Sequence, residues 1–133
     1  MAIHSMRGQL GPSDTRTLIM DDGIFTQGHV ITKLTIIGGN NGSLPAEVVL
    51  SYSSTMPTSI DFEDSDQIGW ALWDADTTTG NRHFFLIDPE HAVLQDLFIH
   101  SLGAACNYLV ELQPVDFTEA QGVLQLIKHA RQA

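Results

Sequence analysis

The feature that most constrains the fold of this chain is a series of short apolar runs between residues 83 and 112. Turn-forming residues divide this segment into three runs, at residues 83–87, 92–99 and 105–112. Runs of this length, bounded by turn formers, are typical of strands and too short for typical buried helices. Pro89 reinforces the first boundary, because proline offers no N–H to a ladder and biases the preceding residue towards extended geometry. The segment therefore predicts three consecutive strands.

Alternation within these runs predicts which side chains are buried. In the last run one face carries Cys106, Tyr108, Val110 and Leu112, and the other carries Ala105, Asn107, Leu109 and Glu111. This pattern is typical of a strand with one buried and one wetter face. In the middle run Val93, Leu97 and Ile99 share a face with Gln95, while Leu94 and Phe98 lie opposite. We therefore expect a single central strand there, covered on both faces.

The same reasoning predicts further strands at residues 16–20, 24–26, 29–37, 46–53 and 67–73. Residues 1–10 are predicted to be an edge strand or an N-terminal arm. Asp22-Gly23 predicts a tight hairpin between the first two of these strands, because Asp-Gly supplies the positive φ that such turns need. In residues 29–37, Ile31 alternates with Thr32 and is expected to share a face with Lys33, opposite Leu34 and Ile36. In residues 67–73, Trp70 is expected to anchor the core.

The pattern changes from strand to helix near the end of the sequence. Thr118 and Gln121 fit a capping box, and one helical face then carries Val123, Leu124, Ile127 and Ala130. This predicts a short helix within residues 118–131. With no helical segment between the strands to carry parallel crossovers, the prediction for residues 1–133 is one mainly β domain. We expect an antiparallel β-sandwich, jelly-roll-like, with one short C-terminal α-helix.

Charge and composition exclude several classes of function. Sixteen acidic residues against six Lys and Arg give a formal net charge of −10, which disfavours direct binding to nucleic acid. No apolar run reaches the roughly 18 residues of a membrane span, and the N-terminus lacks the pattern of a signal peptide. Cys106 is the single cysteine, so an intrachain disulfide is excluded, and its apolar surroundings indicate a buried, unreactive thiol.

The densest polar cluster contains Asp61, Glu63, Asp64, Asp66, Asp74 and Asp76. Carboxylates on a loop can bind calcium, which takes six to eight oxygen ligands. An EF-hand needs glycine at its sixth position and a carboxylate at its twelfth, yet counting from Asp61 these positions hold Asp66 and Leu72. A solvated acidic loop is therefore favoured over a calcium site.

No other motif assigns chemistry to particular residues. His83, His91 and His100 lack zinc-binding spacing, and no serine-nucleophile or phosphate-binding motif is present. Glu111 with Asp116, or Asp88 with Glu90, would suit an acid/base pair, but an acidic chain contains such pairs by chance. The sequence thus predicts no catalytic, cofactor-binding or metal-binding residue.

Three segments carry a resemblance to a known class of proteins: residues 68–71 (IGWA), 85–91 (FLIDPEH) and 107–110 (NYLV). In this order, before a short terminal helix, they resemble small β-sandwich or jelly-roll virion proteins of marine bacteriophages, across roughly residues 15–131. The resemblance implies a non-catalytic structural subunit that forms homo-oligomers and contacts other virion proteins. It also implies localisation in the virion, after assembly in the host cytoplasm.

Two further functions are compatible with the residues. A carbohydrate-binding module, aided by calcium, would stack sugar rings on Trp73, Tyr52 or Tyr108 and bind hydroxyls with loop carboxylates. A small β-barrel enzyme would need convergent polar groups in a pocket, which the sequence does not indicate. We therefore expect the structural role and keep the carbohydrate-binding module as the alternative.

Overall fold

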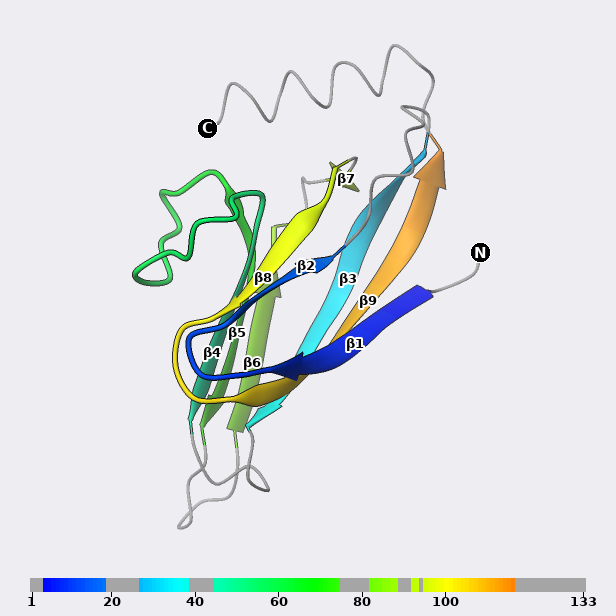
Figure 1. The fold of residues 1–133 in the computed structure, drawn as a ribbon. Coiled ribbons are helices and arrows are strands. Elements are labelled where there is room, and N and C mark those ends of the chain that lie inside the picture. The colour runs from blue at the N-terminus through cyan, green and yellow to red at the C-terminus, as the bar shows by residue number, and fades with distance from the viewer. Residues whose placement is uncertain are drawn as a thin grey trace.

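The computed structural model describes residues 4–18, 27–38, 45–74, 82–88, 92–93 and 95–116, which form two antiparallel sheets (Figure 1). One sheet has four strands in the order β1 (His4–Leu10), β9 (Cys106–Asp116), β3 (Gln27–Gly38) and β7 (Ala92–Val93). The other has five, in the order β2 (Thr15–Leu18), β8 (Leu97–Ser101), β4 (Ala46–Ser51), β5 (Gln67–Asp74) and β6 (Arg82–Ile87). The prediction of a mainly β, antiparallel fold is confirmed for the described residues.

The strand pairs are nested along the chain. β1 pairs with β9, β2 with β8, β3 with β7, and β4 with β5. The described strands thus follow the plan of one long hairpin, rolled so that its two arms contribute to both sheets. β6 falls outside this nesting and extends the second sheet beyond β5. As a result, each sheet brings together segments from both ends of the sequence.

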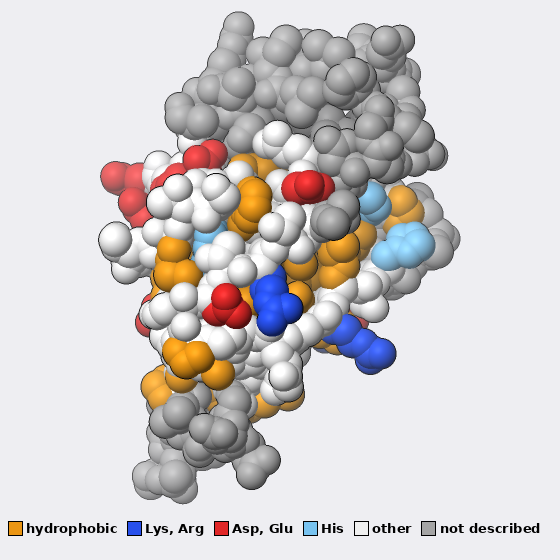
Figure 2. Space-filling model, viewed as in Figure 1, with side chains coloured by type: hydrophobic (Ala, Val, Ile, Leu, Met, Phe, Trp, Pro, Cys, Tyr) orange, Lys and Arg blue, Asp and Glu red, His pale blue; other side chains and the backbone are white. Residues whose placement is uncertain are grey.

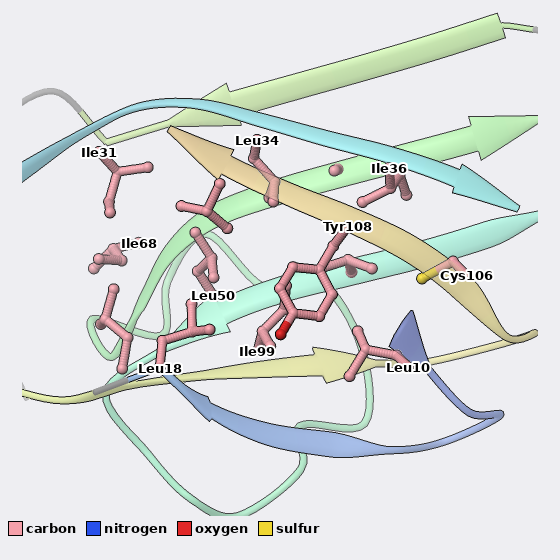
Figure 3. Packing of buried hydrophobic residues seen from close by; sticks show 14 of the residues in the cluster. Leu10, Leu18, Ile31, Leu34, Ile36, Leu50, Ile68, Ile99, Cys106 and Tyr108 are labelled. Atoms are coloured by element: carbon pink, nitrogen blue, oxygen red, sulfur yellow. The ribbon is translucent and has the colours of Figure 1, made fainter. Parts of the chain in front are cut away.

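The apolar core lies between the two sheets (Figure 3). Its fully buried members come from both layers and include Leu10, Leu34, Ile36, Leu50, Ile68, Ile99 and Val110. Burying one such side chain contributes about 1.5–3 kcal/mol. Cys106, Tyr108, Val110 and Leu112 all face this core, which confirms the alternation predicted for the last strand.

Two register shifts correct the predicted faces of other strands. In β3 the ladder with β9 shifts between Ile31 and Lys33, so Ile31 turns into the core beside Leu34 and Ile36 instead of sharing a face with Lys33. In β5 the ladder with β4 shifts between its Gly69 and Gln67 partners. An extra residue at such a bulge reverses the alternation that follows it.

The β5 shift decides the position of both tryptophans. Ile68 and Ala71 are buried in the core and Trp73 packs against it. Trp70 falls on the outer face of the five-stranded sheet, opposite Leu86 of β6 and Val49 of β4. The prediction that Trp70 anchors the core is therefore wrong, and Trp73 contacts the core instead.

The run at residues 92–99 is two strands and not one. Val93 belongs to β7 in the four-stranded sheet, and Leu97 begins β8 in the other. The chain bends at Gln95 between them, so Val93, Leu97 and Ile99 reach the same core from opposite layers. β8 does lie inside its sheet, between β2 and β4.

The predicted arm or edge strand at residues 1–10 is an edge strand over His4–Leu10. The hairpin turn at residues 21–23, the strand predicted at 24–26 and the helix predicted at 118–131 lie outside the described residues. The described part of the first hairpin arm, β2, pairs with β8.

Gly8 allows β1 to pass close to an aromatic ring. It lies opposite Tyr108, and a Cβ placed there would lie 2.8 Å from the tyrosine oxygen and 3.1 Å from ring carbon Cζ. Alanine normally stabilises a strand relative to glycine. We predict instead that Gly8→Ala lowers the free energy of unfolding by about 1–2 kcal/mol, because the ring must move within a packed core.

Urea denaturation of a double-mutant cycle with Tyr108→Phe checks this prediction. The phenylalanine lacks the oxygen nearest to the new methyl group, so the Gly8→Ala cost should be smaller in that background. An alanine that is neutral or stabilising in the wild-type background would contradict the contact.

Candidate functional site

The long connection from β4 to β5, residues 52–66, is held by its own polar groups, and we call it the β4–β5 loop. Asp61 Oδ1 accepts a hydrogen bond from the Glu63 N–H (2.9 Å), and Asp64 Oδ1 accepts one from the Asp66 N–H (3.0 Å). Backbone bonds from Asp64 N–H to Asp61 O and from Tyr52 N–H to Asp66 O close the loop. Two of the acidic side chains thus serve as turn-forming acceptors.

Gln67, the first residue of β5, attaches this loop to the sheet. Its side chain is only 3% exposed and makes hydrogen bonds through both amide atoms. Oε1 accepts from the Asp61 N–H and from the Trp70 indole Nε1–H, both at 2.9 Å. Nε2 donates to Ser59 O (3.1 Å) and to Asp64 Oδ2 (3.4 Å). One buried amide therefore fixes two points of the loop backbone, one carboxylate and the indole ring.

His100 holds the start of the same loop. It is fully buried, its Nε2 lies 2.9 Å from Ser53 O and its Nδ1 lies 2.8 Å from Thr15 Oγ1. Because a carbonyl oxygen only accepts, Nε2 carries the proton, and Nδ1 accepts from the threonine hydroxyl. Burial lowers the pKa of His100, although the bond to Ser53 opposes that effect. The ring is a neutral structural clamp between β2, β8 and the loop.

Beside Gln67 the loop and β5 enclose an open cleft of about 260 Å³, which we call the Phe62–Trp70 cleft. Its lining residues are Phe62, Glu63, Asp64, Ser65, Gln67, Trp70 and Asp88. The Phe62 ring is 69% exposed and meets Trp70 nearly edge-on, with ring centroids 4.7 Å apart and an interplanar angle of 79°. Figure 2 shows acidic side chains gathered over the loop. The cleft therefore combines two perpendicular aromatic rings with carboxylates.

The surroundings of Tyr52 carry a negative potential. Burial raises the pKa of Tyr52, and the negative charges of Asp88 and Asp66 raise it further. Asp88 is held beside β5 by a 2.8 Å hydrogen bond from its N–H to Ile68 O. Hence a carboxylate that lines the cleft also acts electrostatically on this side of the loop.

Comparisons with known proteins identify no relative of this chain. No family model, curated protein or solved structure matches the chain. Within the described part of the chain, no helix is long and apolar enough to cross a membrane.

The acidic and histidine side chains considered as metal ligands from the sequence are only partly within the described residues. Among the described residues, no group of three or more His, Cys, Asp or Glu is placed to hold a metal ion. Asp74 ends β5, while Asp76 and His91 lie outside the described residues. His83 accepts a hydrogen bond from the Ile36 N–H (3.1 Å) and so links β6 to β3. Its pKa is lowered by burial and by the positive charge of Lys33.

Of the two acid/base pairs considered from the sequence, the structure describes both residues of only one, Glu111 with Asp116. Glu111 and Asp116 are five residues apart on β9, which corresponds to about 16 Å of extended strand, well beyond the spacing of glycosidase carboxylates. Glu90 lies outside the described residues. Cys106 is buried, and burial raises the pKa of its thiol to about 11, in agreement with the predicted unreactive thiol.

The aromatic residues expected to stack on sugars contribute to the apolar core and do not line the cleft. Tyr108 is buried in the core, and Tyr52 and Trp73 pack against it. The cleft instead uses Phe62 and Trp70, which the sequence reasoning did not assign to a site. One signal was present: Phe62 is an aromatic residue flanked directly by two carboxylates, Asp61 and Glu63.

A second surface feature is the outer face of β5 and β6. Leu72, Phe84 and Leu86 are 36%, 53% and 43% exposed. The ladder places Leu72 opposite Phe84, and Trp70 opposite Leu86, so these side chains form one apolar patch, here called the β5–β6 patch. Exposed apolar side chains gathered in this way are typical of interaction surfaces.

Proposed function

We propose that this chain is a non-catalytic structural subunit that associates with other copies of itself, and that the assembly is a viral particle. The observation that carries the proposal is the β5–β6 patch. Exposed Leu and Phe side chains on a flat sheet face stabilise a protein–protein contact when a partner sheet covers them. The assignment to a virion rests on the resemblance of residues 68–71, 85–91 and 107–110 to bacteriophage virion proteins.

The nested strand pairing supports the finer, jelly-roll description of the sandwich. Eight strands paired first with last, second with second-last and so on, in two layers, are what a rolled hairpin produces, and β6 is then an addition at one edge. Jelly rolls occur in viral capsid proteins and also in lectins. Because a fold alone does not decide function, the argument for assembly depends on the patch.

Charge favours this face for contact between copies. Each copy carries a net charge of −10, so two copies repel each other wherever acidic surfaces meet. Residues 83–87 contain no Asp, Glu, Lys or Arg, and His83 lies on the opposite face of β6 from Phe84, where its ring accepts a hydrogen bond from a backbone N–H of β3. The four members of the patch carry no charge, and the exposed Glu47 of β4, opposite Leu72, borders them. Copies can therefore approach over the patch itself without pairing like charges.

Phe84→Lys tests the proposal, with Thr32→Lys as a control of equal charge at an exposed position on β3. We expect wild type and the control to form the same oligomer in size-exclusion chromatography with light scattering. Phe84→Lys should weaken association by about 30-fold or more, as loss of a central interface residue does. A wild type that stays monomeric at high concentration, or an unaffected Phe84→Lys oligomer, would contradict the proposal.

A further inference from the structure

The side chains of the Phe62–Trp70 cleft are rich in hydrogen-bond acceptors and poor in donors. The Trp70 indole N–H is already donated to Gln67, and both Nε2 hydrogens of Gln67 are donated to Ser59 O and Asp64. Among the described side chains that line the cleft, this leaves the Ser65 hydroxyl as the donor that is still available. Glu63, Asp64 and Asp88 contribute carboxylates, each with several lone-pair sites. The complementary ligand therefore supplies donors and positive charge.

The arrangement of the Phe62 and Trp70 rings further restricts the class of ligand that the cleft can bind. Because Phe62 and Trp70 are nearly perpendicular, they do not form the single flat platform on which a sugar ring stacks. Perpendicular rings instead present two walls, and the negative faces of aromatic rings attract a cation within about 6 Å. A sugar hydroxyl can donate to the carboxylates, but its oxygens would find only the Ser65 hydroxyl as an available side-chain donor among the described lining residues.

The volume of the cleft and the number of groups that could ligate an ion favour an organic cation over a metal ion. A cleft of about 260 Å³ is smaller than the usual range for drug-sized ligands and suits one alkyl chain with a charged head. No group of carboxylates and imidazoles within the described residues is placed to hold a metal ion. An ammonium needs fewer oxygen partners and gains from aromatic walls.

We propose that the Phe62–Trp70 cleft binds an alkylammonium group, presented either by a lysine side chain of a partner protein or by a free polyamine. Phe62 and Trp70 contact the alkyl carbons and the cation, Glu63 accepts its hydrogens, and Asp88 adds negative charge at the cleft wall. Asp64 contributes negative charge while it remains bonded to Gln67. The cleft and the β5–β6 patch share Trp70, but Phe62, Glu63 and Asp88 line only the cleft, whereas Leu72, Phe84 and Leu86 belong only to the patch.

Titration of the ¹⁵N-labelled protein with n-butylammonium chloride, followed by NMR, tests the proposal. The indole N–H signal of Trp70, identified by its loss in Trp70→Phe, should shift saturably. Butan-1-ol, the neutral analogue, and KCl at matched ionic strength should not produce this shift. Phe62→Ala and Glu63→Gln should each weaken binding by about two- to fivefold, as expected for cation–π contacts and surface charge pairs. Glu47→Gln, which removes a carboxylate outside the cleft, should leave binding unchanged.

Spermidine and a capped Gly-Lys-Gly peptide then distinguish the two sources of the amine. Tighter binding of spermidine indicates a free polyamine, and tighter binding of the peptide indicates a lysine side chain of a partner protein. Equal shifts with butan-1-ol, no saturable shift, or equal effects of Glu47→Gln and Glu63→Gln would overturn the proposal. So would a neutral monosaccharide that binds more tightly than the amine. The folded state of each variant is checked in the same spectra, and Phe62 and Glu63 are both exposed.

Discussion

Replacing His100 with alanine should lower the free energy of unfolding by about 2–4 kcal/mol. The substitution removes a fully buried ring together with its hydrogen bonds to Ser53 O and Thr15 Oγ1. A cavity remains beneath the β4–β5 loop, and the Ser53 carbonyl loses its donor. Urea denaturation measures the change. His4→Ala, at an exposed position on β1, is the matched control and should change stability by less than about 0.5 kcal/mol.

The pH dependence of the same pair of proteins tests whether His100 is neutral in the folded state. Burial lowers its folded pKa, whereas the unfolded chain takes up a proton near pH 6.5. The stability that His100 contributes is therefore fully present above about pH 6.5 and is lost as the pH falls through and below that value. His83 acts in the same direction but is present in both proteins, so it cancels in the comparison.

The stability gap between wild type and His100→Ala should therefore narrow as the pH falls from about 7.5 to about 5.5, by at most about 1.4 kcal/mol for each pH unit. A gap that stays constant, or widens in acid, would mean that the folded protein accommodates the imidazolium. The acceptor role assigned to Nδ1 towards the Thr15 hydroxyl, and with it the neutral state of the ring, would then be wrong.

The strands were predictable from local sequence wherever one face of a strand is buried and no bulge intervenes. β9 is the clearest case, because Cys106, Tyr108, Val110 and Leu112 alternate without interruption and all face the core. β6 was likewise bounded by turn residues, and its range agrees closely with the structure. In β9 the side-chain alternation carries the information, and in β6 the length of the apolar run and its turn-forming boundaries do.

The faces of β3 and β5 were not predictable, because a bulge is a property of two strands and not of one. Ile31 and Ile68 enter the core only because each ladder shifts register beside them. The partner of β3 is β9, roughly 80 residues later in the sequence. The nested strand pairing was not predictable for the same reason. It joins segments from opposite ends of the chain, and no local sequence pattern indicates which distant strand will be the neighbour.

For the candidate site, composition predicted the acidic loop but not its organisation. Asp61, Glu63, Asp64 and Asp66 do form an irregular connection, within which the side chains of Asp61 and Asp64 accept turn-forming hydrogen bonds. The cleft depends on Trp70 facing outward, which follows from the unforeseen bulge. It depends equally on the hydrogen bonds of the Gln67 side chain. These were not predictable, because a glutamine at the start of a strand is common and no sequence pattern indicates its partners.

Gln67→Leu should destabilise the protein by about 3 kcal/mol, even though the side chains have similar volumes. Leucine fills the site without a cavity but leaves the Asp61 N–H, the Trp70 indole N–H and the Ser59 carbonyl without their present partner. Each buried polar group stranded in this way costs about 1–3 kcal/mol, less where water can reach it. Chemical denaturation measures the loss, and Gln9→Leu on the exposed side of β1 is the control.

The Gln67→Leu substitution should increase local opening of the β4–β5 loop more than that of the two sheets. In Gln67→Leu, amide exchange in the β4–β5 loop and at the Trp70 indole should accelerate, while β9 and β3 stay protected. Gln67→Glu provides a sharper contrast, because it keeps two acceptor oxygens for Asp61 and Trp70. It loses both donors and places a second carboxylate next to Asp64. Its destabilisation should grow as the pH rises from about 4 to 7 and the carboxyl group introduced at position 67 ionises.

If Gln67→Leu leaves both stability and loop exchange unchanged, the turns formed by Asp61 and Asp64 suffice to hold the loop. Gln67 would then merely fill space, and the donor-poor character argued for the cleft would lose its basis, because the Trp70 N–H would be available to a ligand. If instead the loop loosens and the sheets do not, a single amide determines the shape of the cleft and which of its hydrogen-bonding groups face outward. Stability and recognition at this end of the molecule would then depend on the same side chain.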